Sequence, residues 1–176
     1  MQQFLLVSSF LLWVVVGFNL LLTVAMVRKL NAMHPEIQSG LKPGTEAPEF
    51  TAQTTSGEAV TLADFAGRKV AFLFISPRCD PCREAMPNYI ELFPKAKQAG
   101  LDIMLVSNTE MDETKAFVEE FKLSRPIILA PRDLLKDYNA LSTPSFCLIN
   151  EQGKVISSGY PSKEFDGWKK LVETLN

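Results

Sequence analysis

Two cysteines separated by two residues, Cys79 and Cys82, are the side chains of this sequence best suited to chemistry. They lie in the run SPRCDPCR (residues 76–83), directly after the apolar run VAFLFI, so Cys79 is expected where a strand turns into a helix. A helix N-terminus stabilises a thiolate through its unpaired amides and its dipole. Cys82, three positions further along that helix, could displace a partner from a mixed disulfide on Cys79. The spacing therefore predicts a redox-active disulfide, Cys79–Cys82.

The residues around the cysteines should tune their reactivity. Arg78 and Arg83 add positive charge that favours a thiolate, whereas Asp80, between the cysteines, opposes it. Pro81 is compatible with a first helical turn, because the amide hydrogen that proline lacks would be unpaired there. The redox potential follows from the balance of these opposing charges.

Three other interpretations of the pair are open. A zinc site would need two more ligands, and only Cys147 and the single histidine, His34, remain. A structural disulfide would close too small a loop to add much stability, and two inert thiols are at odds with a charged, proline-rich turn. We therefore expect no metal and no cofactor beyond the disulfide itself. Cys147 is predicted to pack as a small apolar residue, and His34 to be solvated.

Hydrophobic patterning predicts the elements that position the cysteines. The continuous apolar run at residues 70–75 is the best candidate for a central strand covered on both faces. A helix should begin near Cys79 and continue through Met86 and Tyr89, with a bend at Pro87. The other expected elements are strands at 59–61, 101–106 and 127–129, a helical turn at 62–65, a helix at 112–121, a hairpin of 145–149 and 154–158, and a closing helix containing Trp168.

This order predicts one α/β domain over residues 44–176, with a mixed central sheet flanked by helices on both faces. Ahead of it, residues 4–27 are uncharged and apolar, and as a helix rising about 1.5 Å per residue they could cross a hydrocarbon layer of about 30 Å. No basic segment precedes this stretch and no A-x-A site follows it, which favours a transmembrane helix over a cleaved signal peptide. We expect an anchor at 1–30 and a tether at 31–43.

The composition narrows the possible partners. The chain has 176 residues and a formal net charge of -2, so no basic field is available to hold nucleic acid. Its 3 cysteines are too few for a small secreted scaffold stapled by disulfides, which leaves chemistry as their use. The expected partners are therefore proteins and, through residues 4–27, the lipid bilayer.

A second motif, Thr143-Pro144 before the apolar strand at 145–149, makes a family resemblance specific. A C-x-x-C after the central strand, a proline in the following helix, and Thr-Pro before the hairpin together resemble a thioredoxin-like fold. The resemblance implies a cis Pro144 beside Cys79, with Thr143 and Pro144 contacting the substrate. The stretches at 44–50, 60–68 and 148–156 resemble the membrane-tethered TlpA and ResA subgroup, and the apolar span with the Ser-Pro-x-Cys-x-x-Cys site is most similar to MauD, an accessory protein of methylamine utilisation.

The resemblance implies a thiol-disulfide oxidoreductase that acts on disulfides or thiols of a partner protein during its maturation, as for the methylamine dehydrogenase small subunit. It also implies an upstream redox partner, itself a membrane thiol-disulfide protein. Two alternatives stay open. A peroxiredoxin-like peroxidase would suit the regions at 62–68 and 133–138, but its P-x-x-x-[ST]-x-x-C pattern requires proline at Phe72. A non-catalytic membrane assembly module would keep its function without either cysteine.

The sequence also departs from the family pattern. Arg78 stands where thioredoxins usually carry tryptophan, and Leu73 where they carry an acidic or polar residue, so the second thiol lacks its usual buried helper in proton transfer. Ala85 occupies the place of a TlpA-like glutamate, and Glu84, one position earlier, points about 100° away on an ideal helix. We expect Glu84 to be solvated rather than a substitute base.

The residues flanking the span bear on its orientation. Arg28 and Lys29 follow it and only the amino terminus precedes it, so the positive-inside rule places the domain in the cytoplasm. The resemblance places the domain outside, and C-x-x-C enzymes on tethers typically serve an oxidising compartment. We expect a single-pass protein of the cell membrane with an extracytoplasmic catalytic domain.

Overall fold

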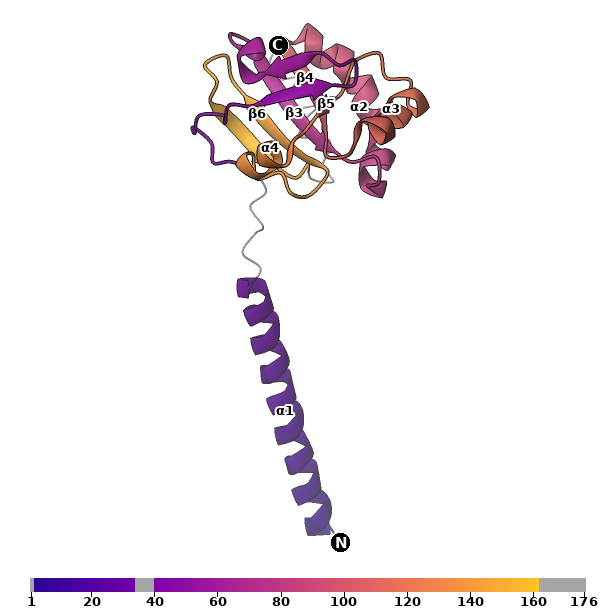
Figure 1. Cartoon of the computed structure of the whole chain (residues 1–176). Helices are drawn as coiled ribbons and strands as arrows, with labels where there is room; N and C mark the ends of the chain where they lie inside the picture. The colour runs from indigo at the N-terminus through magenta and orange to yellow at the C-terminus, as the bar shows by residue number, and fades with distance from the viewer. Residues whose placement is uncertain (1, 34–39, 162–176) are drawn as a thin grey trace. The chain divides into compact units, whose positions relative to one another are not determined.

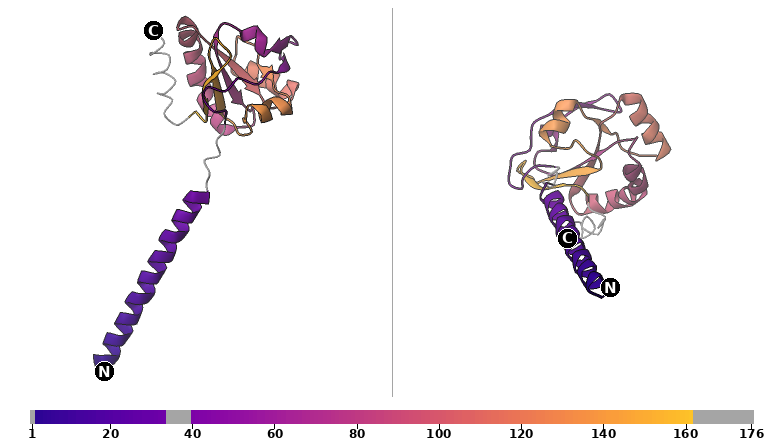
Figure 2. Two further views of the ribbon diagram at one scale, coloured as in Figure 1. Left: turned by 90° about the vertical axis from the view of Figure 1, so that its left-hand side faces the viewer. Right: turned by 90° about the horizontal axis from the view of Figure 1, so that it is seen from below.

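The computed structural model describes residues 2–33 and 40–161, in two compact units that divide between residues 37 and 38. The first unit is helix α1 (Gln2–Met33), one continuous helix in each turned view (Figure 2). Within it, Val7–Lys29 has a mean hydropathy of 2.4, and its most apolar window is not buried by any other part of the structure. By length and composition this helix could span a membrane, as expected for residues 4–27.

Two polar side chains in α1 bond within the helix itself. Asn19 donates from Nδ2 to the carbonyl of Val15 at 3.1 Å, and Thr23 donates from Oγ1 to the carbonyl of Asn19 at 2.8 Å. Bonds of this kind satisfy polar groups without water or a second helix. These residues are therefore compatible with an apolar surrounding.

The second unit is built on a seven-stranded mixed sheet, with strands in the order β2-β1-β5-β4-β3-β6-β7. Strand β3 is the predicted central strand: it pairs in parallel with β4 and antiparallel with β6. Figure 1 shows the sheet running through the middle of this unit. The strands are β1 (Thr51–Thr54), β2 (Ala59–Thr61), β3 (Lys69–Ile75), β4 (Leu101–Ser107), β5 (Ile128–Leu129), β6 (Ser145–Ile149) and β7 (Val155–Gly159).

The pleat of the sheet divides the core into two layers. Alternate residues of β3 enter different hydrophobic clusters, with Leu73 on one face and Phe72 on the other. Helices α2 (Asp80–Gln98) and α3 (Met111–Glu120) cover the face of Leu73. The short helices η1 (Leu62–Phe65) and α4 (Arg132–Asp137) cover the face of Phe72. The prediction of helices on both faces of a mixed sheet is confirmed.

Most predicted elements are confirmed, with bounds that differ by a residue or two. Two elements were not predicted, namely β1, which pairs with both β2 and β5, and α4. Helix α2 continues through Pro87, where a bend is predicted, and also through Pro94. The predicted closing helix with Trp168, and also His34, lie outside the described residues.

The second unit includes part of the segment predicted as a tether. The amide of Gly40 donates to the carbonyl of Asn139 at 2.9 Å, and the hydroxyl of Ser158 donates to the carbonyl of Leu41 at 2.6 Å. The amide of Gly44 donates to the carbonyl of Val155 at 2.8 Å. Residues 40–43 are therefore bonded to the folded unit rather than free of it.

Candidate active site

Cys79 lies at the junction of the central strand and helix α2. Strand β3 ends at Ile75, and the amide of Cys79 donates back to the carbonyl of Ser76 at 3.0 Å, which forms a tight turn. Cys79 is the N-cap residue of α2, and its sulfur accepts a hydrogen bond from the amide of Cys82 at 3.3 Å. Pro81 falls in the first turn, where its missing donor leaves no bond unmade. The predicted strand-to-helix turn is confirmed, and the helix N-terminus contacts the sulfur directly.

The two cysteines differ in exposure and reactivity. Their sulfur atoms lie 2.6 Å apart, and both residues are free thiols in the structure. Cys79 is partly exposed, whereas Cys82 is completely buried. Burial, followed by the hydrogen bond with Cys79, raises the pKa of Cys82 to about 12. Because the thiolate is the nucleophile, this arrangement makes Cys79 the sulfur that can attack from solvent.

The Thr143-Pro144 motif lies against Cys79. The peptide bond between Thr143 and Pro144 is cis, and the Cys79 thiol donates to the carbonyl of Thr143 at 3.4 Å. Leu141, two residues before Thr143, is 69% exposed. The structure thus brings together residues 64 positions apart in the sequence, as the family resemblance implied.

The charged residues beside the cysteines are paired with acids on α3. Arg78 binds the carboxylate of Glu113, with an Nε to Oε2 distance of 2.8 Å, and its side chain is 73% exposed. Arg83 is paired with Glu120. Each arginine thus has a carboxylate partner that offsets its field, so the positive charge that the sequence adds beside the cysteines acts more weakly on a thiolate than an unpaired charge would. Asp80 is exposed in the first turn of α2, where the helix dipole favours an acid.

The side chains packed around Cys82 are mostly apolar. Leu73, Met86 and Tyr89 are buried in the same cluster as Cys82. Burial first, and then the nearby cysteines, raise the pKa of Tyr89 to about 12, so its phenol stays neutral. Glu84 is exposed, as expected for a solvated helix residue.

Tyr89 was predicted only as part of the helix, not as a neighbour of the site. The signal that could have found it is its position seven residues after Cys82, which is about two turns along the same helix face. The acids that pair with the arginines carry no such signal, because they lie on another helix.

Cys147 lies on the opposite face of the sheet from the cysteine pair. It pairs across the sheet with Phe72 and is buried in the cluster under η1 and α4. Burial raises the pKa of Cys147 to about 12. This placement supports the predicted packing role. Within the described residues, no group of three or more His, Cys, Asp or Glu side chains could hold a metal ion.

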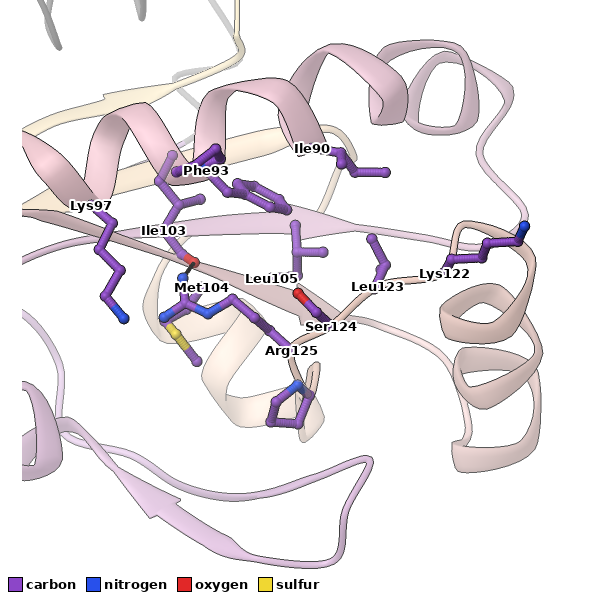
Figure 3. Close-up of a pocket in the computed structure, with 12 residues that line it drawn as sticks. Ile90, Phe93, Lys97, Ile103, Met104, Leu105, Lys122, Leu123, Ser124 and Arg125 are labelled. Atoms are coloured by element: carbon purple, nitrogen blue, oxygen red, sulfur yellow. Dashed lines mark hydrogen bonds between the residues drawn. The ribbon is translucent and has the colours of Figure 1, made fainter.

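An apolar pocket of about 420 Å³ lies further along α2. In Figure 3, Phe93 from α2 points toward Leu105 of β4, and Arg125 borders the pocket on the segment before β5. The lining on α2 begins at Ile90, about two turns beyond Cys82. The pocket is therefore separate from the cysteine pair.

Comparison with known proteins points to one family. A model of the AhpC/TSA family matches residues 43–158. The chain is 34% identical over 125 residues to the thiol-disulfide oxidoreductase ResA of Bacillus thuringiensis, covering 69% of this chain and 72% of that protein. It is 32% identical over 120 residues to the thioredoxin-like protein YneN of Bacillus subtilis, covering 66% of this chain and 70% of that protein. The thioredoxin domain of a thiol-disulfide oxidoreductase from Bacteroides vulgatus superposes with a TM-score of 0.68 at 26% identity, over 77% of this chain and 99% of that domain.

Proposed function

This chain belongs to the AhpC/TSA family as a thioredoxin-like, ResA-like thiol-disulfide oxidoreductase, and from that premise we propose that it acts on a partner protein during maturation of that partner. The observation that carries the proposal is the partly exposed sulfur of Cys79, held between the N-terminus of α2 and the carbonyl of Thr143. A polypeptide disulfide can reach this sulfur, whereas Cys82 is closed to one. The MauD-like features of the sequence suggest a cysteine-rich enzyme subunit as the partner.

The exchange proceeds in two steps that balance in sulfur and electrons. The Cys79 thiolate attacks a substrate disulfide, forms a mixed disulfide and releases one substrate thiolate. Cys82 loses its proton and attacks the Cys79 sulfur, which forms the Cys79–Cys82 disulfide and releases the second substrate thiolate. Two electrons pass to the substrate, and an upstream dithiol protein returns them. Run in reverse, the same steps oxidise a substrate dithiol.

Thr143 and Pro144 are proposed to contact the substrate. The Thr143 carbonyl already accepts a bond from Cys79, so a substrate chain bound to Cys79 must pass beside this loop. Arg78, Asp80 and Pro81 are proposed to tune the site through the ion pair and the first helical turn.

We place this activity at a membrane. Helix α1 is long and apolar enough to serve as an anchor, and the tethered resemblance supports an extracytoplasmic domain even though Arg28 and Lys29 follow the span. Protease treatment of intact cells that carry a C-terminal epitope tag tests the orientation. Protection of the tag until the cells are lysed would put the domain in the cytoplasm.

Trapping a partner protein as a mixed disulfide tests the proposed enzymatic function directly. In the Cys82→Ser variant the attacking sulfur remains and the resolving sulfur is lost, so a partner should accumulate on Cys79 through a link that dithiothreitol cleaves. The matched control is Cys147→Ser, which should trap nothing because that residue is buried on the other face of the sheet. If Cys82→Ser traps no protein, and the double variant lacking Cys79 and Cys82 retains function in cells, the role is that of an assembly module.

A further inference from the structure

Arg83 bonds the chain on both sides of Cys79. Its amide donates to the Cys79 carbonyl at 3.1 Å, which is an ordinary helical bond. Its guanidinium Nη1 donates to the carbonyl of Pro77 at 3.2 Å, which lies outside the helix in the turn that precedes Cys79. One residue therefore holds the peptide before the attacking cysteine and the peptide after it.

Helix α3 and Phe121, the residue that follows it, contact the other side of the same guanidinium. Nη2 pairs with Glu120, and the guanidinium carbon lies 5.9 Å from the ring centre of Phe117 and 5.7 Å from that of Phe121. The two charged side chains are 35% and 49% exposed, so the ion pair alone would contribute little. What distinguishes the arrangement is that the planar guanidinium of Arg83 contacts a carbonyl, a carboxylate and two aromatic rings at once.

Helix α3 is a fixed support for this contact. Thr114, in its first turn, is fully buried, and its hydroxyl lies 2.9 Å from that of Ser107 at the end of β4 and 3.1 Å from that of Thr109. Phe117 is buried in the cluster that also contains Cys82. The guanidinium therefore connects the active-site turn to an element anchored in the core.

The position of this turn decides the surroundings of the Cys79 sulfur. The sulfur lies 3.3 Å from the amide of Cys82 and 3.4 Å from the carbonyl of Thr143, so a shift of the turn would change both contacts. A displacement of about 1 Å in a reacting group can change a rate by a large factor. A contact from outside the turn therefore adds to the turn's own bond, from the Cys79 amide to the Ser76 carbonyl, in keeping the sulfur on the helix amides.

We propose that Arg83 is a positioning residue for disulfide exchange, which fixes the turn at Pro77 so that the Cys79 sulfur stays against the N-terminus of α2. The proposal rests on exchange at the cysteine pair but not on the identity of the substrate. Lysine at position 83 would restore the positioning of the turn only in part, because a single ammonium group cannot bond the Pro77 carbonyl and the Glu120 carboxylate in the way that the planar guanidinium does.

The test uses the full-length chain in detergent micelles, reduced, with Arg83→Met and Arg83→Lys. Two quantities are measured: the rate of Cys79 alkylation by iodoacetamide at about pH 7, resolved by mass spectrometry of the peptides, and the equilibrium constant of the cysteine pair with glutathione. Arg83→Met should slow alkylation about three- to tenfold and shift the equilibrium toward the Cys79–Cys82 disulfide, because the thiolate loses the helix amides. Arg83→Lys should fall between this variant and the unchanged chain.

Arg125→Met is the matched control. Arg125 also donates to a backbone carbonyl, that of Ile103 at 3.3 Å, also pairs with an acid, Asp102, and is likewise 35% exposed, but it lies at the separate pocket. Arg125→Met should lower the melting temperature without changing the rate of Cys79 alkylation or the equilibrium constant with glutathione. If Arg83→Met lowers the melting temperature as Arg125→Met does while alkylation and equilibrium stay unchanged, the positioning role is overturned. Neither readout uses a protein substrate, so a failure to trap a partner would not affect this result.

Discussion

The difference between the two active-site thiols can be measured by removing one at a time. In Cys79→Ala only Cys82 remains at the site, and in Cys82→Ala only Cys79 remains. Cys82 is completely buried, and burial is the largest cause that raises its pKa to about 12, ahead of the hydrogen bond with Cys79. Removing Cys79 therefore leaves the main cause in place.

The structure sets the size of the expected effect. A pKa of about 12 in place of the ordinary 9.0 lowers the thiolate population at neutral pH about a thousandfold, since each pH unit is a factor of ten. Alkylation follows the thiolate, and burial also hinders the reagent. Allowing for the lost contribution of Cys79, we expect Cys79→Ala to be alkylated at no more than about one hundredth of the rate of Cys82→Ala.

The assay is iodoacetamide labelling of each reduced, folded variant, followed by mass spectrometry of the peptide that contains the remaining cysteine. Cys147 in the same samples is an internal reference for a buried thiol, because it is on the other face of the sheet and its pKa is also raised to about 12. Labelling of Cys82 at a rate comparable to that of Cys79 would refute the assignment of Cys79 as the attacking sulfur.

Three further predictions concern the folded unit, each tested on the full-length chain in detergent. Burial raises the pKa of Cys82 and of Cys147 from 9.0 to about 12, so between these values the folded form keeps protons that the unfolded form has lost. The free energy of unfolding should therefore fall as the pH rises from about 9 to about 12, and thermal unfolding across that range measures this loss. Phe72, buried and packed edge-on against three aromatic rings, should destabilise the protein by about 3–5 kcal/mol when replaced by alanine, measured by chemical denaturation. Gly40→Ala should lower the melting temperature more than Gly44→Ala. Both glycines have a positive φ, 98° and 85°, but a Cβ at Gly40 would also overlap the Ser158 side chain, whereas one at Gly44 meets open space.

The parts of the fold that could be predicted carry their signal in adjacent residues. The run at 70–75 is apolar throughout because β3 is buried on both faces, and the hairpin of β6 and β7 is marked by a turn containing glycine. Strand β1 has no such signal: it is the sequence TAQT, whose inward residues are only alanine and threonine, and it is defined by its pairing with β2 and β5. Helix α4, at six residues, is too short to show a helical period.

The cysteine pair could be predicted for the same reason, because attack and resolution depend on a spacing within one helix. The cis peptide at Pro144 and its place beside Cys79 followed from the family resemblance, since no local pattern connects residues 64 positions apart. Tyr89 lies between these cases: its spacing from Cys82 is local, but its burial beside the cysteines depends on the sheet beneath α2.

The partners of the two arginines are the part of the site that the sequence could not predict, and the reason is physical. Two arginines next to a cysteine suggest a positive field, but a sequence does not show which acids will reach them. Because α2 and α3 cover the same face of the sheet, Arg78 meets Glu113, 35 positions later, and Arg83 meets Glu120, 37 positions later. A paired charge acts weakly beyond its partner, whereas the amide of Cys82 contacts the Cys79 sulfur at 3.3 Å. The N-terminus of α2 therefore contacts the Cys79 sulfur directly, whereas the charge of each arginine is offset by its acid on α3.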